Sequence, residues 1–288
     1  MNLQEAIDYT FENKDEWIEG SGRTTARINT NHILRLLDPN TDVETINPKT
    51  FNEMKRVLKE EEWAKGKKRT NGGINRILSA LSTVINFCHR MGEIDNKATF
   101  LRLKEKEHKA KFYTEEEWLS LMDAARQVEG GDGDLLYDSM LFAYYTGDRQ
   151  SEMLTLKWST VDFENNTITF LDTKNGTDHT LPISKEIRPM LEERFHHRTC
   201  DRVFPWDGCR DGADALRRAL RKAKKIAGMD PNEDRLWHSI RHTTGTHLCS
   251  KGVPLRTVMG VLNHSNINTT LRYAKNTDKA IADALELL

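Results

Sequence analysis

Six side chains in the second half of the sequence have the types needed to handle a phosphate ester. Two of them are arginines, Arg149 and Arg241. A guanidinium group donates several hydrogen bonds in one plane, which suits the non-bridging oxygens of a phosphodiester as charge builds on them. The other four are a lysine, two histidines and a tyrosine: Lys174, His238, His264 and Tyr273.

The lysine and the tyrosine could carry out the bond exchange itself. Lys174 precedes an Asn-Gly pair, and a lysine at a hairpin tip can protonate a leaving alkoxide. Tyrosine is a poor nucleophile near its usual pKa of about 10, but nearby cations favour the phenolate, which can attack phosphorus to form a phosphotyrosine. The phosphotyrosine bond conserves the energy of the phosphodiester bond that was broken. We therefore predict no cofactor and no metal.

Each of these residues also has an ordinary structural interpretation. Arg149 and Glu152, like His238 and Arg241, are three residues apart, a spacing that often gives a simple ion pair or polar contact on a helix. His242 lies about 100° around the helix from Arg241 and is expected to face elsewhere, so we interpret it as structural. His247 is interpreted in the same way.

A zinc site is the alternative from a different class of protein. Its ligands would be two adjacent histidines and two cysteines, but their spacing does not match the common zinc patterns. The residues in question are His196, His197, Cys200 and Cys209.

The composition describes a soluble protein with locally concentrated positive charge. The 288 residues carry a net charge of -1, and the four cysteines have no framework spacing, which favours a reducing, cytosolic compartment. No apolar run approaches a membrane span. Phosphate binding requires a local positive surface rather than a positive total. The predicted DNA-binding residues are Lys67, Lys68, Arg69, Lys109, Lys111, Arg217, Arg218 and Arg221.

Residues 1–95 are predicted to form a small four-helix domain. Helices are expected at residues 3–19, 24–37 and 48–64, the last opened by Asn47-Pro48. The fourth has an apolar stripe at helical spacing and ends before Gly92. The stripe consists of Ile74, Ile77, Leu78, Leu81, Val84, Ile85 and Cys88. Residues 96–111 are charged and are predicted to form a linker.

Residues 112–288 are predicted to form a second, mainly α domain with a small antiparallel sheet. Thr114 and Glu117 make a capping box, and residues 135–145 read as a buried helix. Strands at 167–171 and 180–183 are joined through the Asn-Gly turn. Further helices are expected at 184–197, 212–227, 236–250, 254–262 and 267–274. The helix at 212–227 should point Leu216, Leu220, Ala223 and Ile226 inward and its basic residues outward.

From about Phe112 onward the chain resembles the catalytic domain of the tyrosine recombinases, the phage-integrase family that includes lambda-integrase, Xer and Cre types. Order and separation of the motifs both fit. The matching segments are Thr146-Gly147-Asp148-Arg149-Gln150-Ser151-Glu152, Thr173-Lys174, His238-Ser239-Ile240-Arg241-His242-Thr243, Leu262-Asn263-His264-Ser265 and Thr269-Thr270-Leu271-Arg272-Tyr273-Ala274.

The resemblance assigns a role to each residue of the set. Arg149 and Arg241 would clamp the phosphate, with His238 between them and His264 as a second positioning histidine. Lys174 would be the general acid. Tyr273 would attack, link to the 3′ phosphate and free a 5′ hydroxyl. Glu152 matches an acidic position expected to orient the basic groups.

The resemblance also implies partners. The first domain is similar in layout to a four-helix SAM-like core-binding domain, and the two domains would surround duplex DNA. We expect a homo-tetramer on two recombination sites, a monomer or weak oligomer when free, a possible accessory directionality factor and no membrane association. The tail at 276–288 would dock on a neighbouring protomer. The setting would be the cytoplasm of a bacterial host, in association with the nucleoid.

Two residues depart from the family pattern, and several functions stay open. Asp148 stands where an apolar or small residue is usual and is expected to point away with a modest effect. Asn263 replaces a common glycine but should tolerate the left-handed turn. Integration or excision of a phage or other mobile element is favoured. The alternatives are an Xer-like chromosome or plasmid dimer resolvase, a relaxing topoisomerase or hairpin-forming resolvase, and a non-catalytic DNA-binding relative.

Overall fold

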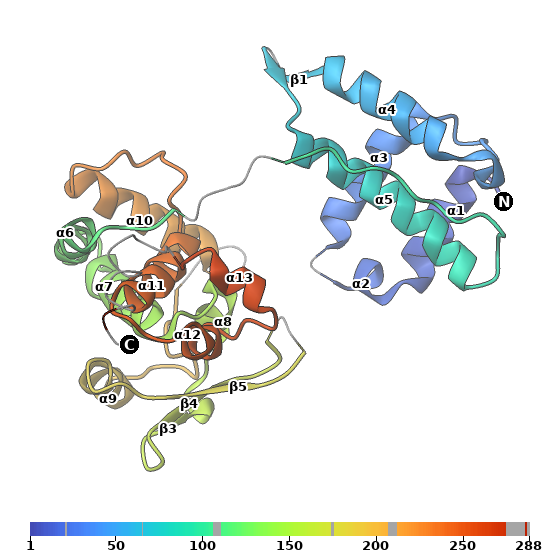
Figure 1. Cartoon of the computed structure of the whole chain (residues 1–288). Helices are drawn as coiled ribbons and strands as arrows, with labels where there is room; N and C mark the ends of the chain where they lie inside the picture. Colours follow the sequence, from blue (N-terminus) through green and yellow to red (C-terminus); the bar gives the residue numbers. More distant parts are fainter. Residues whose placement is uncertain are drawn as a thin grey trace. The chain divides into compact units, whose positions relative to one another are not determined.

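The computed structural model describes residues 1–20, 22–64, 66–105, 111–173, 176–206, 212–274 and 286. The chain divides into two compact units, Met1–His108 and Lys109–Leu288 (Figure 1). Each unit has a hydrophobic core of its own. The two units therefore bury their apolar side chains separately.

The described part of the N-terminal unit is mainly helical, with one short hairpin. A single 3₁₀ turn, Val43–Thr45, precedes the fourth helix. The elements are α1 (Leu3–Asn13), α2 (Asp15–Ile18), α3 (Arg23–Leu36), α4 (Pro48–Glu60), β1 (Glu62–Ala64), β2 (Lys67–Lys68) and α5 (Asn71–Arg90).

The prediction of one helix over residues 3–19 was wrong. Lys14 has an extended backbone, with φ −100° and ψ 108°, and separates α1 from α2. This break turns the chain so that Trp17 packs on Phe11, with ring centroids 4.8 Å apart. Burial of Trp17 against α1 therefore determines where the first helix ends, and no local signal at Lys14 announces it.

The helix predicted to run to residue 64 ends earlier, at Glu60. Glu61 adopts an extended conformation, and the chain enters the antiparallel β1–β2 hairpin, with Glu62 opposite Lys68. Strands of two and three residues are too short to show a strand period, so this hairpin could not be predicted from the sequence pattern.

Helix α5 is the centre of the N-terminal core, as its apolar stripe predicts. All seven stripe residues are buried. Residues 96–105 lie along the same helix, where the Asn75 side chain bonds the backbone of Leu103 in both directions at 2.9 Å. Asn86 likewise accepts from the Ala98 amide at 3.1 Å. Part of the charged segment assigned to the linker thus packs on α5.

The described part of the C-terminal unit is also mainly helical. The 3₁₀ turn Trp158–Thr160 leads into its sheet. The elements are α6 (Glu115–Arg126), α7 (Asp132–Thr146), α8 (Gln150–Thr155), β3 (Val161–Asp162), β4 (Thr167–Phe170), β5 (His179–Pro182), α9 (Arg188–His196), α10 (Ala213–Ile226), α11 (His238–Ser250), α12 (Leu255–Val261) and α13 (Ile267–Leu271).

Helix α7 runs through the core of this unit and packs against α6, α10 and α11 (Figure 1). Leu136, Met140, Phe142 and Ala143 are almost fully buried, in agreement with the predicted core helix. Its C-terminal end and the neighbouring end of α12 carry the backbone of the candidate site. None of the helices in the described ranges has the length and apolar surface that a bilayer span requires.

The sheet has three antiparallel strands in the order β3-β4-β5. The predicted β4–β5 pair is present, with Thr167 opposite Pro182 and Phe170 opposite His179. Strand β3 was not predicted, because two residues show no period. Of the predicted turn, Lys174 and Asn175 lie outside the described residues, and Gly176 has φ 71°. The mainly α fold with small antiparallel sheets is confirmed.

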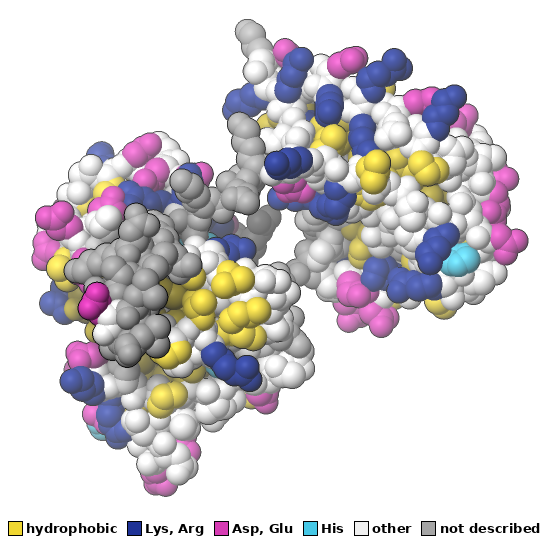
Figure 2. Space-filling view, viewed as in Figure 1, with side chains coloured by type: hydrophobic (Ala, Val, Ile, Leu, Met, Phe, Trp, Pro, Cys, Tyr) yellow, Lys and Arg dark blue, Asp and Glu magenta, His cyan; other side chains and the backbone are white. Residues whose placement is uncertain are grey.

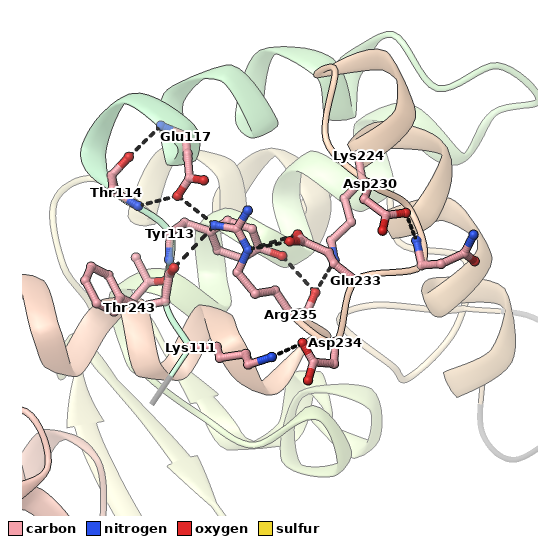
Figure 3. Close-up of polar contacts among 12 residues, drawn as sticks. Lys111, Tyr113, Thr114, Glu117, Lys224, Asp230, Glu233, Asp234, Arg235 and Thr243 are labelled. Atoms are coloured by element: carbon pink, nitrogen blue, oxygen red, sulfur yellow. Dashed lines mark hydrogen bonds and ion pairs between the residues drawn. The ribbon is translucent and has the colours of Figure 1, made fainter. Parts of the chain in front are cut away.

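A charged network around Arg235 anchors the start of α11, the helix that bears His238 and Arg241 (Figure 3). Arg235 bonds Glu117 on α6 at 2.7 Å and both carboxylate oxygens of Glu233 at 2.9 Å. The hydroxyl of Tyr113 donates to the Arg235 carbonyl at 3.0 Å, and the Tyr113 amide donates to Thr243 on α11 at 2.9 Å. Residues 111–117 and α11 are therefore held to one another.

Candidate active site

The turn between α7 and α8 carries Arg149. Gly147 ends α7 with φ 61°, and a Cβ atom there would lie 2.6 Å from Cδ2 of Leu262, so this position requires glycine. Arg149 is the N-cap of α8. Its Nη1 donates to Oε1 of Glu152 at 2.6 Å, and its amide donates to Oε2 at 2.8 Å. Glu152 therefore fixes both the backbone and the side chain of Arg149.

Arg241 is the most deeply buried cation of the set, with 3% of its surface exposed. Its Nη1 donates to the carbonyl of Gly147 at 2.5 Å, and its Nη2 donates to the carbonyl of Leu262. Burial, reinforced by the charge of Arg149, lowers the pKa of Arg241 to about 10. The group is still cationic at neutral pH, and it joins the C-terminal ends of α7 and α12.

Tyr273 follows α13 and is only 4% exposed. Its hydroxyl lies 2.7 Å from Nδ1 of His242, and its ring stacks near that of His264 with centroids 6.3 Å apart. Burial raises the pKa of the Tyr273 hydroxyl, while the charges of Arg241 and Arg272 act in the opposite direction. The tyrosine is thus a neutral phenol among cationic and imidazole groups.

The structure corrects the interpretation of His242. This side chain was expected to face away from the site, yet it contacts the Tyr273 hydroxyl, and its ring lies 4.6 Å from that of His238. Tyr273, which follows α13, packs on that side of α11. His247 does act structurally, because its Nδ1 lies 2.9 Å from the hydroxyl of Tyr144.

The turn between α12 and α13 holds His264. The φ of Asn263 is 47°, in agreement with the expectation that asparagine tolerates the left-handed turn. Nδ1 of His264 lies 2.9 Å from the Thr270 hydroxyl. Burial, followed by the charges of Arg241 and Arg149, lowers the pKa of His264 to about 4. His264 is therefore neutral in the free protein.

The side chain of Asn263 also connects this turn to the β4–β5 hairpin. Its Nδ2 donates to the hydroxyl of Thr173 at 3.1 Å. The Thr173 hydroxyl donates to the Thr177 carbonyl at 2.7 Å, and the Gly176 amide donates to the Thr173 carbonyl at 2.7 Å. Lys174, the predicted general acid, lies outside the described residues. Its neighbour Thr173 is buried and tied to the loop that carries His264.

Asp148 is also placed differently from the prediction. It lies in the turn between two helices rather than on a helix, and it points inward with 5% of its surface exposed. The Thr146 hydroxyl donates to its Oδ1 at 2.9 Å, whereas Oδ2 has no hydrogen-bond partner. Burial raises the pKa of Asp148 to about 7, and the charge of Glu152 adds to this effect.

The predicted DNA-binding residues have varied surroundings. Lys67 and Lys68 are exposed on β2, and Lys109 lies outside the described residues. Lys111 pairs with Asp234. On the visible face of the N-terminal unit, Lys and Arg side chains are frequent over α4 and around the start of α5 (Figure 2). Arg69 approaches the ring of His32 at 3.4 Å.

Helix α10 is amphipathic as predicted, with two exceptions. Arg218 and Arg221 are exposed, and Arg217 pairs with Asp214 at 2.7 Å. Lys224, expected to point outward, is 1% exposed and pairs with Glu233 at 3.2 Å. It lies four residues after Leu220, on the apolar face of the helix. Ile226, expected to point inward, is 44% exposed at the end of the helix.

The zinc alternative finds no support in the described residues. Among them, no three His, Cys, Asp or Glu side chains are grouped as metal ligands. Cys209 lies outside the described residues.

Comparison with known proteins decides the family. The model of the phage integrase family matches residues 111–280, which include every motif of the site. The chain belongs to the phage integrase family. Its members are the tyrosine recombinases, which are site-specific recombinases.

Curated tyrosine recombinases are similar over much of the chain. Tyrosine recombinase XerA of Pyrococcus furiosus is 25% identical over 93% of this chain and 89% of its own length. Tyrosine recombinase XerC of Staphylococcus aureus is 28% identical over 72% of this chain and 70% of its own length.

Solved integrase structures share the fold. The Tn1549 transposon integrase in complex with circular intermediate DNA has a TM-score of 0.72 at 17% identity, over 99% of both chains. A lambda integrase tetramer bound to a Holliday junction has a TM-score of 0.71 at 18% identity, over 96% of this chain and 78% of that one.

Proposed function

We propose that this tyrosine recombinase cleaves and rejoins duplex DNA through a covalent 3′-phosphotyrosine on Tyr273. The observation that carries the proposal is the convergence of four chain segments. The turn before α8 supplies Arg149, α11 supplies Arg241, and the segments around α13 supply His264 and Tyr273. The charges of both arginines act on His264, and that of Arg241 acts on Tyr273, so a phosphate bound by the arginines would lie near the phenol.

The step balances with the residues of the chain. The Tyr273 oxygen bonds to phosphorus and gives its proton to a neighbouring base, and the bond from phosphorus to the 5′ oxygen breaks. Lys174 supplies the proton that the 5′ oxygen takes up. Arg149 and Arg241 stabilise the charge on the non-bridging oxygens, and His238 and His264 donate to the same oxygens. Attack by a 5′ hydroxyl on the phosphotyrosine reverses these changes and joins a new strand.

The rigid support of Arg241 fits this task. Its two terminal nitrogens already bond main-chain carbonyls, so the guanidinium plane is fixed before DNA arrives. A preorganised donor requires no rearrangement in the transition state, and removing one such donor typically costs about 100- to 1,000-fold in rate.

We further propose that the protein acts as a homo-tetramer on two recombination sites in the cytoplasm, and that it integrates or excises a mobile element. The fold similarity to the transposon and lambda integrases supports this role. A dimer-resolution role is the second candidate, because the sequence relatives are Xer recombinases that match most of the chain. Recombination of reporter plasmids that carry either the ends of a flanking element or a chromosome-terminus site separates the two roles.

A nicked suicide substrate tests the cleavage chemistry. Once such a substrate is cut, the short 5′-hydroxyl fragment diffuses away and the covalent complex accumulates. The wild-type protein should form a complex that survives denaturing electrophoresis. Tyr273→Phe should bind the same DNA and form none. A covalent complex of equal yield in the Phe variant would place the nucleophile elsewhere.

A further inference from the structure

Within the described ranges, His242 makes a direct polar contact with the atom that is proposed to attack phosphorus. Its Nδ1 lies 2.7 Å from the Tyr273 hydroxyl. The motif assigned by resemblance uses His238 and His264, so His242 has no role in that scheme. The contact joins α11 to the residue that follows α13.

A glycine on α11 makes room for the tyrosine in this contact. His242 and Gly245 are three residues apart and share one face of the helix. A Cβ atom at residue 245 would lie 2.8–3.0 Å from three atoms of the Tyr273 ring. The ring can therefore lie flat against the helix only because residue 245 has no side chain. Val258 and Leu262 form a buried cluster with Tyr273.

The protonation states and the tautomer of His242 together set the direction of the hydrogen bond. Burial lowers the pKa of His242 to about 4, and the charges of His238, Arg272, Arg241 and His264 act in the same direction. Burial raises the pKa of Tyr273. At neutral pH the imidazole is neutral and the phenol is protonated. In the tautomer that carries its proton on Nε2, Nδ1 accepts from the Tyr273 hydroxyl, and this arrangement precedes proton transfer.

We propose that His242 is a further catalytic residue, whose Nδ1 receives the proton of the Tyr273 hydroxyl as that oxygen bonds to phosphorus. This inference rests on the proposed phosphotyrosine chemistry. The phenolic O–H bond breaks, the bond from oxygen to phosphorus forms, and the proton stays on the imidazole. In the rejoining step the imidazolium returns this proton to the departing tyrosine oxygen.

Binding of the phosphate should make His242 a better acceptor. The groups that depress its basicity include Arg241, Arg272 and the neighbouring imidazoles of His238 and His264. A phosphate anion between the arginines offsets their charge and favours an imidazolium beside it. A bound phosphate therefore assists proton transfer from Tyr273, and in the free enzyme the phenol stays protonated.

His242→Asn is the most informative variant. The asparagine Oδ1 can take the place of Nδ1 as a hydrogen-bond acceptor, but it cannot hold a proton near neutral pH. We expect normal DNA binding and a first-turnover cleavage rate reduced by about 100- to 10,000-fold on the suicide substrate. A structural role would be preserved by asparagine, so a rate within threefold of wild type, or a faster rate, would overturn the proposal.

His247→Asn is the matched control. His247 lies on the same helix and makes the same kind of contact, with Nδ1 2.9 Å from the hydroxyl of Tyr144. It lies outside the proposed reaction, so cleavage by this variant should remain within a few-fold of wild type. A comparable loss in both variants would show that the helix responds to any change and would contradict a specific role of His242.

Chemical rescue provides a second measurement that does not depend on the asparagine variant. In His242→Ala, added imidazole should restore part of the cleavage rate in proportion to its concentration, with no such effect on the wild type. Absence of rescue with DNA binding intact would count against proton transfer. Failure of the proposed function itself would be recognised separately, because the wild-type protein would then form no covalent complex.

Discussion

At the scale of single residues, the site combines groups whose charges are controlled by burial. Arg241 remains cationic although it is almost fully buried, whereas His242 and His264 are neutral. The two arginines can therefore dominate the local field, and the imidazoles can accept or donate hydrogen bonds without adding repulsion. Asp148 adds a buried carboxyl next to Arg149 in the sequence.

Asp148→Asn should alter the pH dependence of stability. The carboxyl has a pKa of about 7 in the folded protein against an ordinary value of 3.8, so the folded state holds a proton that the unfolded state releases in this interval. The contribution of this proton to the free energy of unfolding is fully present below about pH 4 and is lost as pH rises to about 7. It amounts to roughly 2–4 kcal/mol.

The asparagine variant keeps the shape of the side chain and cannot ionise. Its free energy of unfolding, measured by urea titration at several pH values, should decline less than that of the wild type between pH 4 and 7. Parallel curves for the two proteins would show that the carboxyl is ionised without penalty and is therefore not enclosed as described.

The segments that carry Arg149, Arg241, His264 and Tyr273 could be recognised in the sequence because each forms a short motif, and the roles of these residues stay predictions. The surroundings of His242 and Asp148 could not be recognised in this way. The contact of His242 depends on where the chain after α13 places Tyr273, and the burial of Asp148 depends on the turn between α7 and α8. Neither the contact of His242 nor the burial of Asp148 can be predicted from the residues beside it in the sequence. The glycine at residue 245, three residues after His242, is the signal that could have suggested close approach of another chain segment.

At the scale of elements, the ends of α7 and α12 act as one frame for Arg241. Both helices end with a carbonyl that accepts from the guanidinium, and Gly147 allows the Leu262 side chain to lie against the α7 terminus. Helix α11 is fixed at its start by the network of Arg235. The site is therefore carried on three helix ends that are bonded to each other.

Gly147→Ala should disturb this frame. The substitution strains a left-handed residue and forces a shift of Leu262, so we expect a loss of about 2–4 kcal/mol in the free energy of unfolding and slower cleavage. Gly228→Ala is the control, because Gly228 has φ 72° but open space around its added Cβ. It should lose only about 1 kcal/mol. Equal losses in urea titrations would exclude a steric contribution at Gly147.

The elements themselves were predicted to very different degrees. The stripe of α5 and the core helix α7 were predictable because burial repeats at helical spacing. The break at Lys14, the β1–β2 hairpin and strand β3 were not, because each spans too few residues to show a repeating pattern. Lys224 illustrates a third case: its side chain belongs to the apolar face, and Glu233 with the Arg235 carbonyl satisfies its charge.

At the scale of the whole molecule, positive charge is local rather than general. The net charge is −1, so binding to DNA must depend on particular basic surfaces. Two candidates are the exposed β2 lysines of the N-terminal unit and the exposed arginines of α10 in the C-terminal unit. The presence of such residues on each unit supports the proposal that both units contact the duplex.

Salt dependence tests the contribution of α10. If Arg218 and Arg221 contact phosphates, replacing both with serine should weaken binding and reduce the slope of log affinity against log salt by about 2. Lys185→Ser is a suitable control, because Lys185 is also exposed and lies outside α10. An unchanged slope in the double variant, measured by fluorescence anisotropy, would remove α10 from the DNA-binding surface.

The central claim is that Tyr273 becomes joined to a DNA 3′ phosphate within the set of cationic and imidazole groups described above. Tryptic digestion of the trapped covalent complex, followed by mass spectrometry, tests it most directly. Cleavage after Arg272 and Lys275 should release the peptide Tyr273-Ala274-Lys275 bearing a nucleotide through its 3′ phosphate. A nucleotide on any other peptide, or a linkage through a 5′ phosphate, would contradict the account.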